Sequence, residues 1–114
     1  MALQIVEKTA NGATVLALSG RVTLGEESSQ LRNKIREMLG KGITCLVLDL
    51  GDVSYIDSTG LGTLVSSFAT AAGKGGTIKL ASLTNRFQDI LSITKLVTVF
   101  EVYDNAEDAA KSCK

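Results

Sequence analysis

The stretch Ile-Thr-Cys-Leu-Val-Leu-Asp-Leu, residues 43–50, is almost continuously apolar. A strand of this kind is typical of a parallel sheet whose two faces are both covered by helices. Residues 51–62 (Gly-Asp-Val-Ser-Tyr-Ile-Asp-Ser-Thr-Gly-Leu-Gly) follow it, and we expect a loop there that leads into a helix. This stretch alone indicates the α/β class.

Upstream, the sequence predicts a hairpin and a helix. Asn11-Gly12 separates two β-prone stretches, and this dipeptide favours a tight turn because both of its residues tolerate positive φ. Antiparallel strands are therefore expected at about 3–9 and 13–19. From about 25 to 39 the apolar residues recur at helical spacing, and Gly40 then ends the helix: Leu31, Ile35, Met38 and Leu39.

Downstream, helices and strands alternate. Helical spacing over 57–73 is carried by Leu61, Leu64, Val65, Phe68 and Ala72. A strand at 77–82, a helix at 84–94, a strand at 98–103 and a short helix from about Asn105 complete the chain. The order ββαβαβαβα predicts one domain over residues 1–114. Its N-terminal hairpin leads into a mixed, mostly parallel sheet of about five strands with about four helices.

The composition of the chain excludes some classes of function. The chain has 114 residues, 45% of them hydrophobic, and twelve basic residues balance twelve acidic ones. Binding to a nucleic-acid backbone normally needs a basic surplus, so no direct nucleic-acid partner is expected. The N-terminus lacks the pattern of a secretory signal, and no apolar run approaches the ~20 residues of a membrane span. The chain therefore reads as cytoplasmic, with no membrane partner.

Histidine is absent, which removes the commonest general base and most zinc sites. We predict that the protein is not an enzyme and that it uses no metal and no cofactor. Cys45 lies inside the apolar strand and is expected to be a small buried hydrophobic residue. Cys113 is the penultimate residue and is expected to fray. A disulfide between the two is left open, because two cysteines do not make a disulfide scaffold.

The start of the helix at 57–73 is the candidate functional segment. Asp57 before the helix is a good N-cap, with Ser58 and Thr59 in the first turn, so capping explains these residues on its own. However, Gly60 and Gly62 each weaken a helix by roughly 0.5–1 kcal/mol relative to alanine. A helix built only for stability would not carry both.

The predicted outer face of this helix is also unusual. It presents small hydroxyl residues, without a charge until Lys74: Thr59, Thr63, Ser66 and Thr70. Solvated helix faces usually carry Glu, Lys and Arg. A small, uncharged face allows another surface to approach closely, so we interpret it as a contact surface.

Two enzymatic or nucleotide-binding interpretations fit less well. Gly60-Leu61-Gly62 lacks the third glycine of a dinucleotide fingerprint, because Val65 stands there. Gly73-Lys74-Gly75-Gly76 lacks the first glycine and the Ser/Thr of a P-loop. Ser58 as a nucleophile would have no base to activate it.

The stretch Val-Leu-Asp-Leu-Gly-Asp-Val-Ser-Tyr-Ile-Asp-Ser-Thr-Gly-Leu-Gly, residues 47–62, resembles the signature of STAS domains, specifically the bacterial anti-sigma factor antagonists. The hairpin start and the βα alternation also match, so the resemblance covers essentially the whole chain. In that family, the serine after the aspartate is phosphorylated by a partner that is both a serine kinase and an anti-sigma factor. A PP2C-type phosphatase removes the phosphate.

The resemblance implies that Ser58 is the phosphorylation site and that the unphosphorylated protein, a monomer when free, binds the kinase. The sigma factor is then released, so transcription is regulated by partner switching. The expected partner-binding residues flank Ser58 or lie in the loop after the second strand: Arg21, Thr23, Asp57, Thr59, Gly60, Gly62, Thr63 and Ser66.

One position departs from the family pattern. Members commonly read Gly-x-Leu-Asp in the loop after the second strand, whereas this chain reads Gly20-Arg21-Val22-Thr23. Thr23 stands where the acid is expected, which changes the local charge if that loop lies beside Ser58. Arg21 and Thr23 are equally interpretable as ordinary polar loop residues.

An alternative function comes from the same fold. STAS domains also serve as scaffolds or ligand-binding modules, in stressosome-like assemblies and in the cytoplasmic parts of anion transporters. Such a module would act without sigma-factor control. Self-association into large particles would distinguish a scaffold from a partner-switching monomer.

Overall fold

Five strands form one sheet in the computed structural model, which describes residues 3–23, 25–93 and 100–113. The strands lie side by side in chain order: β1 (Gln4–Ala10), β2 (Ala13–Val22), β3 (Cys45–Ile56), β4 (Thr77–Ala81) and β5 (Glu101–Tyr103). β1 pairs with β2 antiparallel, and the three remaining pairs are parallel. The predicted α/β class and mostly parallel sheet are confirmed. Residues 98 and 99 of the last predicted strand lie outside the described residues.

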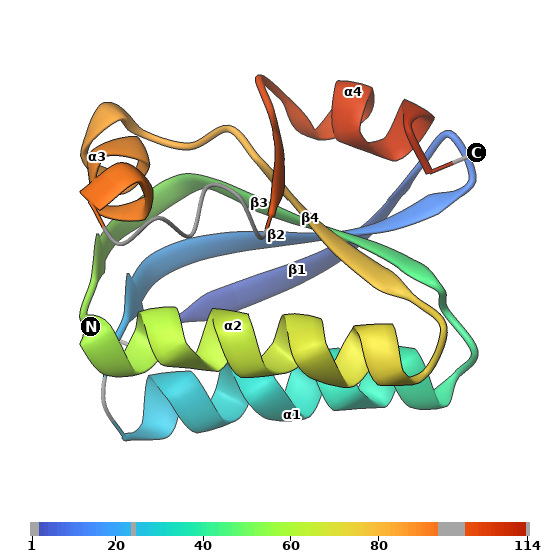
Figure 1. The fold of residues 1–114 in the computed structure, drawn as a ribbon, viewed down its shortest axis with the longest axis horizontal. Helices are drawn as coiled ribbons and strands as arrows, with labels where there is room; N and C mark the ends of the chain where they lie inside the picture. Colours follow the sequence, from blue (N-terminus) through green and yellow to red (C-terminus); the bar gives the residue numbers. More distant parts are fainter. Residues whose placement is uncertain (1–2, 24, 94–99, 114) are drawn as a thin grey trace.

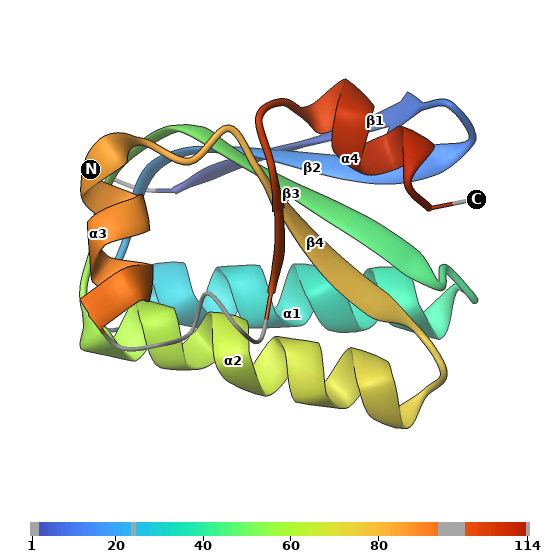
Figure 2. The ribbon, with the colours of Figure 1, turned by 45° about the horizontal axis from the view of Figure 1, so that its top comes forward.

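Four helices cover this sheet: α1 (Glu26–Gly40), α2 (Ser58–Gly73), α3 (Asn85–Ile93) and α4 (Ala106–Lys111). Figure 1 shows α1 and α2 side by side along one face and α4 on the opposite face, and the turned view in Figure 2 agrees. α3 lies at the end of the sheet where β3 finishes. Both faces of the central strands are therefore covered, as the apolar sequence of β3 predicts.

The hairpin turn forms as the sequence predicts. Asn11 and Gly12 both have positive φ, 50° and 80°, and Ala10 pairs with Ala13 on either side of them. Positive φ at both central residues matches the right-handed twist of the two strands. The turn therefore fixes the register of β1 against β2.

The main core lies between the sheet and the pair α1 and α2. The apolar residues predicted to recur along α1 are buried there: Leu31, Ile35, Met38 and Leu39. Leu61 and Leu64 of α2 and Phe87 of α3 join them. The prediction for α2 was wrong at Ala72, which is exposed, while its neighbour Ala71 is fully buried. Beneath α4 a second, thinner cluster of mostly small residues packs: Ala13, Val15, Val47, Ala81, Ala109 and Ala110.

β3 continues six residues beyond the predicted boundary at Leu50 and ends at Ile56. The segment expected to be a loop, residues 51–56, mixes polar and apolar residues, and it pairs with the end of β2 through two register shifts. Val53 and Ile56 are buried, while the residues between them face solvent. This spacing of three breaks the alternation by which a strand is recognised in a sequence.

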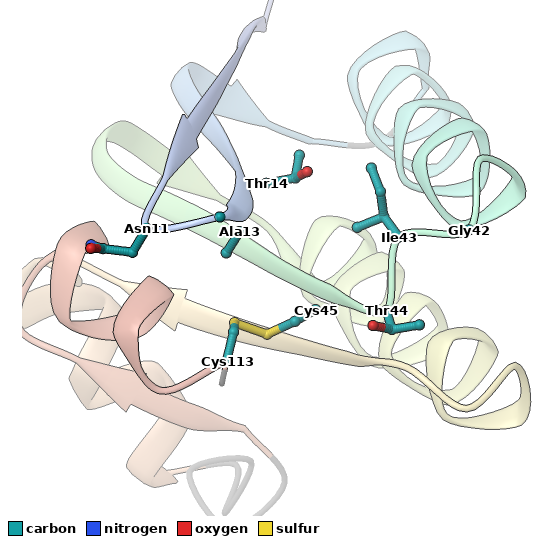
Figure 3. A pocket seen from close by; sticks show the side chains of 9 residues that line it. Asn11, Ala13, Thr14, Gly42, Ile43, Thr44, Cys45 and Cys113 are labelled. Atoms are coloured by element: carbon teal, nitrogen blue, oxygen red, sulfur yellow. A yellow bond between two sulfur atoms is a disulfide. The ribbon is translucent and has the colours of Figure 1, made fainter.

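The two cysteines form a disulfide, which corrects both expectations for them. Cys45 at the start of β3 is bonded to Cys113, with 5.9 Å between their Cα atoms. Cys113 is half-buried rather than frayed, and its backbone N–H donates to the carbonyl of Ala110. The yellow bond in Figure 3 ties the end of the chain to the amino end of the central strand.

Lys79 of β4 makes a second attachment beneath α4. Its side chain is buried, and its ammonium donates to the hydroxyl and the carbonyl of Ser112 and to the carboxylate of Glu101. The Tyr103 hydroxyl donates to the same carboxylate, and these two donors hold the pKa of Glu101 below its usual value. Paired in this way, a buried lysine is tolerated in a small cluster of alanines.

Candidate functional site

The candidate site lies at the edge of the sheet where β2 and β3 end and α2 begins. The backbone N–H of Asp57 donates to the carbonyl of Val22, which fixes the end of β3 against the end of β2. The Asp57 carboxylate accepts a hydrogen bond from the N–H of Gly60 at 2.8 Å, and the Leu61 N–H donates to the Asp57 carbonyl. The predicted N-cap is confirmed, and it sets the direction in which α2 leaves the sheet.

Ser58 is the first residue of α2 and its side chain is exposed. Within the part of the chain that the structure describes, its hydroxyl makes no hydrogen bond. The helix N-terminus also presents backbone N–H groups and the positive end of the helix dipole. A group transferred to this oxygen would therefore be accessible to an enzyme and would be electrostatically tolerated by the helix.

The exposed face of α2 differs from the predicted one by one position. Four residues spaced four apart are exposed and are named here the α2 stripe: Ser58, Gly62, Ser66 and Thr70. The stripe is uncharged, as expected. Thr59, predicted to belong to this face, is only half exposed, and Thr63 is 2% exposed.

Thr63 was wrongly assigned to the outer face, because the small residues of α2 serve two surfaces. Its hydroxyl donates to the carbonyl of Thr59, and Ser67, one turn further on, is buried as well. Ser67 and its neighbours line a cavity of about 80 Å³ between α1 and α2: Arg32, Ile35, Arg36, Ser66, Ser67 and Thr70. Part of the small-residue pattern thus serves the packing of the two helices, while the α2 stripe stays exposed.

Gly60 is buried for a structural reason. A Cβ built on it would lie against the carbonyl oxygen of Val22, closer than real Cβ atoms come, and 2.9 Å from side-chain carbons of Val22 and Ile56. Gly62 lies two residues further along the helix and is exposed. A Cβ added to it would have nothing within 4 Å. The two glycines that the sequence suggested were equivalent therefore differ: Gly60 allows α2 to approach the end of β2, and Gly62 belongs to the α2 stripe.

Thr23 takes part in the start of α1. Its hydroxyl donates to the Glu27 carboxylate at 2.6 Å, and its carbonyl accepts from both the N–H and the hydroxyl of Ser28. A carboxylate is thus present beside position 23, although it is supplied by Glu27. The sequence did not single out Glu27, whose only signal was its place in the first turn of a helix.

Arg21 lies over an aromatic ring that the sequence did not single out. Its guanidinium is 5.3 Å from the ring centroid of Tyr55, its partner in the parallel register of β2 and β3. Arg86, in the first turn of α3, is 5.8 Å from the same centroid. Tyr55 is 40% exposed, and both arginines are exposed. Arg21, Tyr55 and Arg86 come together through the register of β2 against β3 and the position of α3, neither of which can be read from the sequence.

The pocket in Figure 3 lies at the other end of β3 from Ser58. It encloses about 280 Å³, and uncharged residues line it: Asn11, Gly12, Ala13, Thr14, Gly42, Ile43, Thr44, Cys45 and Cys113. Across the described ranges, no three Cys, Asp or Glu side chains are grouped to hold a metal ion. Among the helices described, none is both long and apolar enough to cross a membrane.

Comparison with known proteins matches this chain to the STAS domain, whose family model covers residues 4–109. A candidate anti-sigma factor antagonist of Thermotoga neapolitana is 34% identical over 97 residues, which are 83% of this chain and 86% of that protein. The anti-sigma-B factor antagonist of Bacillus subtilis is 36% identical over 77 residues, covering 68% of this chain and 70% of that protein. The crystal structure of a candidate anti-sigma factor antagonist from Thermotoga maritima superposes with a TM-score of 0.86 at 25% identity, covering 96% and 93% of the two chains.

Proposed function

This chain belongs to the STAS family, and on that premise we propose that it is an anti-sigma factor antagonist controlled by phosphorylation of Ser58. Unphosphorylated, it binds an anti-sigma factor that also has serine kinase activity, and the sigma factor goes free. Phosphorylation of Ser58 releases the kinase, and a PP2C-type phosphatase reverses the change. Transcription is then regulated through the partner bound at one surface.

The observation that carries the proposal is the position of the Ser58 hydroxyl. It is exposed at the first residue of α2, and it begins the uncharged α2 stripe that a partner could cover. The relatives named as anti-sigma factor antagonists support the choice of partner class.

The effect of a phosphate falls on the partner rather than on the fold. Phosphoserine adds about −1.5 to −2 charge, which the N–H groups and dipole of a helix N-terminus tolerate. The same charge, placed beside the Asp57 carboxylate at the start of the uncharged α2 stripe, would be buried in the interface with the kinase. Like charges brought together in an interface cost several kcal/mol, so binding falls while the domain stays folded.

Replacing Ser58 by Asp should weaken binding of the anti-sigma factor about a hundredfold, equivalent to about 2.7 kcal/mol. The single carboxylate carries less charge than phosphate but occupies the same place. Ser58→Ala should bind as wild type does and should not be released by ATP. Isothermal titration calorimetry with the purified anti-sigma factor measures the first effect, and mass spectrometry after incubation with that protein and ATP measures the second.

Asn33→Asp is the matched control, since Asn33 is exposed on α1 and the change adds one negative charge without adding bulk. It should bind as wild type does. Equal binding by wild type, Ser58→Ala and Ser58→Asp would disprove the switch. Elution of the free protein as large particles in size-exclusion chromatography would instead favour the scaffold alternative over a monomer.

A further inference from the structure

Two exposed arginines and one exposed tyrosine gather at the edge of the sheet that carries Ser58. Arg21 comes from β2, Tyr55 from β3 and Arg86 from α3, and both guanidiniums lie within 6 Å of the tyrosine ring centroid. At such distances a cation is attracted to the face of an aromatic ring, so the ring holds both side chains near it. These three residues are named here the Arg–Tyr–Arg cluster.

The cluster carries positive charge that the described part of the chain does not neutralise. Among the described residues, the ion pairs involve only lysines, and neither Arg21 nor Arg86 faces a carboxylate within 4 Å. Two cations on one ring repel each other, and that repulsion is relieved when an anion is bound between them or beside them.

The surface at the cluster suits a ligand that rests on it better than a side chain that inserts into it. Between the end of β3 and α3 lies a hollow of only about 20 Å³, and Tyr55 and Arg86 are among its lining residues. This volume is about that of one water molecule, too small to admit a side chain. A ligand at this place would therefore contact the guanidiniums at the surface.

We propose that the Arg–Tyr–Arg cluster docks a carboxylate-bearing, acidic segment of the protein partner whose binding Ser58 controls. Arginine forms bidentate hydrogen bonds with carboxylates, and arginine and tyrosine are the residue types on which binding energy concentrates at protein interfaces. This inference rests on the proposed function, and it adds to it the chemistry of the partner.

A protein segment fits the surroundings better than nucleic acid does. The chain has no net charge, and the cluster holds only two cations. A nucleic-acid backbone needs many cationic contacts for affinity. An acidic side chain needs only the two arginines.

The first test uses a defined probe and does not need the partner. Hexaglutamate peptide is titrated into ¹⁵N-labelled protein at low ionic strength, and the Arg Nε–H and backbone amide signals are followed by NMR. The signals of Arg21, Tyr55 and Arg86 should shift, and the shifts should vanish in the Arg21→Gln/Arg86→Gln double variant and at high salt. Hexalysine should cause none of them.

Four outcomes, two in this titration and two in parallel measurements, would overturn the proposal. The cluster signals could stay unchanged, or Arg36 on α1 could shift equally, which would indicate unspecific attraction. A single-stranded oligonucleotide could shift the cluster signals at lower concentration than hexaglutamate does, which would point to nucleic acid. Finally, phosphorylation of Ser58 alone could shift them fully, which would mean that the protein's own phosphate occupies the arginines.

The second test uses the anti-sigma factor. Arg21→Gln and Arg86→Gln should each weaken binding about tenfold and reduce its salt dependence, because each removes a charge at the interface. Lys8→Gln is the control: Lys8 is an exposed cation on β1 that makes no ion pair among the described residues, and the variant should bind as wild type does.

The two proposals fail in different ways. If Ser58→Asp releases the partner but both arginine variants bind as wild type does, the docking cluster is wrong and the switch stands. If the arginine variants weaken binding but Ser58→Asp does not, the switch is wrong and the cluster stands.

Discussion

Reduction of the Cys45–Cys113 disulfide is expected to lower the free energy of unfolding by about 4 kcal/mol. The bond joins residues 68 positions apart, so it encloses more than half of the chain. Loop closure of this length removes a large part of the conformational freedom of the unfolded chain. In the folded state the bond also holds the six-residue helix α4, which is too short to be stable alone and rests on small residues.

Urea denaturation followed by circular dichroism, with and without a dithiol reductant, measures this loss. The midpoint should fall by more than about 1 M, since a small domain loses about 1–3 kcal/mol of stability per molar urea. Cys113→Ser should behave like the reduced wild type, and the reductant should then change nothing further. Identical midpoints for oxidised and reduced wild type would show that the link does not stabilise the fold.

Gly60→Ala is expected to cost about 3 kcal/mol of stability, at the upper end of the range for overpacking. The added Cβ would meet the carbonyl oxygen of Val22, and this carbonyl is held in place by the Asp57 N–H. A flexible side chain could move aside, but a hydrogen-bonded backbone group cannot move without shifting the end of β2. The variant should therefore either unfold at clearly lower urea concentration or fail to accumulate as folded protein.

Gly62→Ala is the matched control, two residues away in the same helix with open space around it. There the methyl group should stabilise α2 by about 0.5–1 kcal/mol, the ordinary advantage of alanine over glycine in a helix. Gly60→Ala should therefore lower the free energy of unfolding, and Gly62→Ala should raise it. A Gly60→Ala variant as stable as wild type would mean that α2 does not approach β2 as closely as described.

Local signals in the sequence predicted the elements that local physics controls. Asn11-Gly12 encoded the hairpin because its backbone conformation is fixed by the two residues themselves. Asp57 encoded the start of α2 because the cap bond spans only three residues, and Asn105 caps α4 in the same way. The family signature drew attention to Ser58, which is exposed, and its phosphorylation stays a prediction.

What the sequence could not predict depends on neighbours distant in the chain. The last six residues of β3 lack the alternation of a strand and become one because β2 extends beside them. Thr63 looked like a surface residue until the position of α1 was known, because small hydroxyl residues suit both a partner surface and a helix–helix contact. Arg21, Tyr55 and Arg86 come together only through strand register and the placement of α3.

The placement of the disulfide has a practical consequence for experiments on this protein. Cys113 is bonded to the amino end of β3, and Ser58 lies just after its carboxyl end, so the twelve residues of β3 separate them. Figure 1 shows the start of α2 and the end of α4 at opposite ends of the molecule. The first strand begins at the same end as Ser58, since Gln4 pairs with Ser19 near the end of β2. A fluorophore, biotin or sensor-chip linkage fused behind Cys113 would therefore leave the surface around Ser58 open to its binding partner, while the same fusion ahead of Gln4 would crowd it.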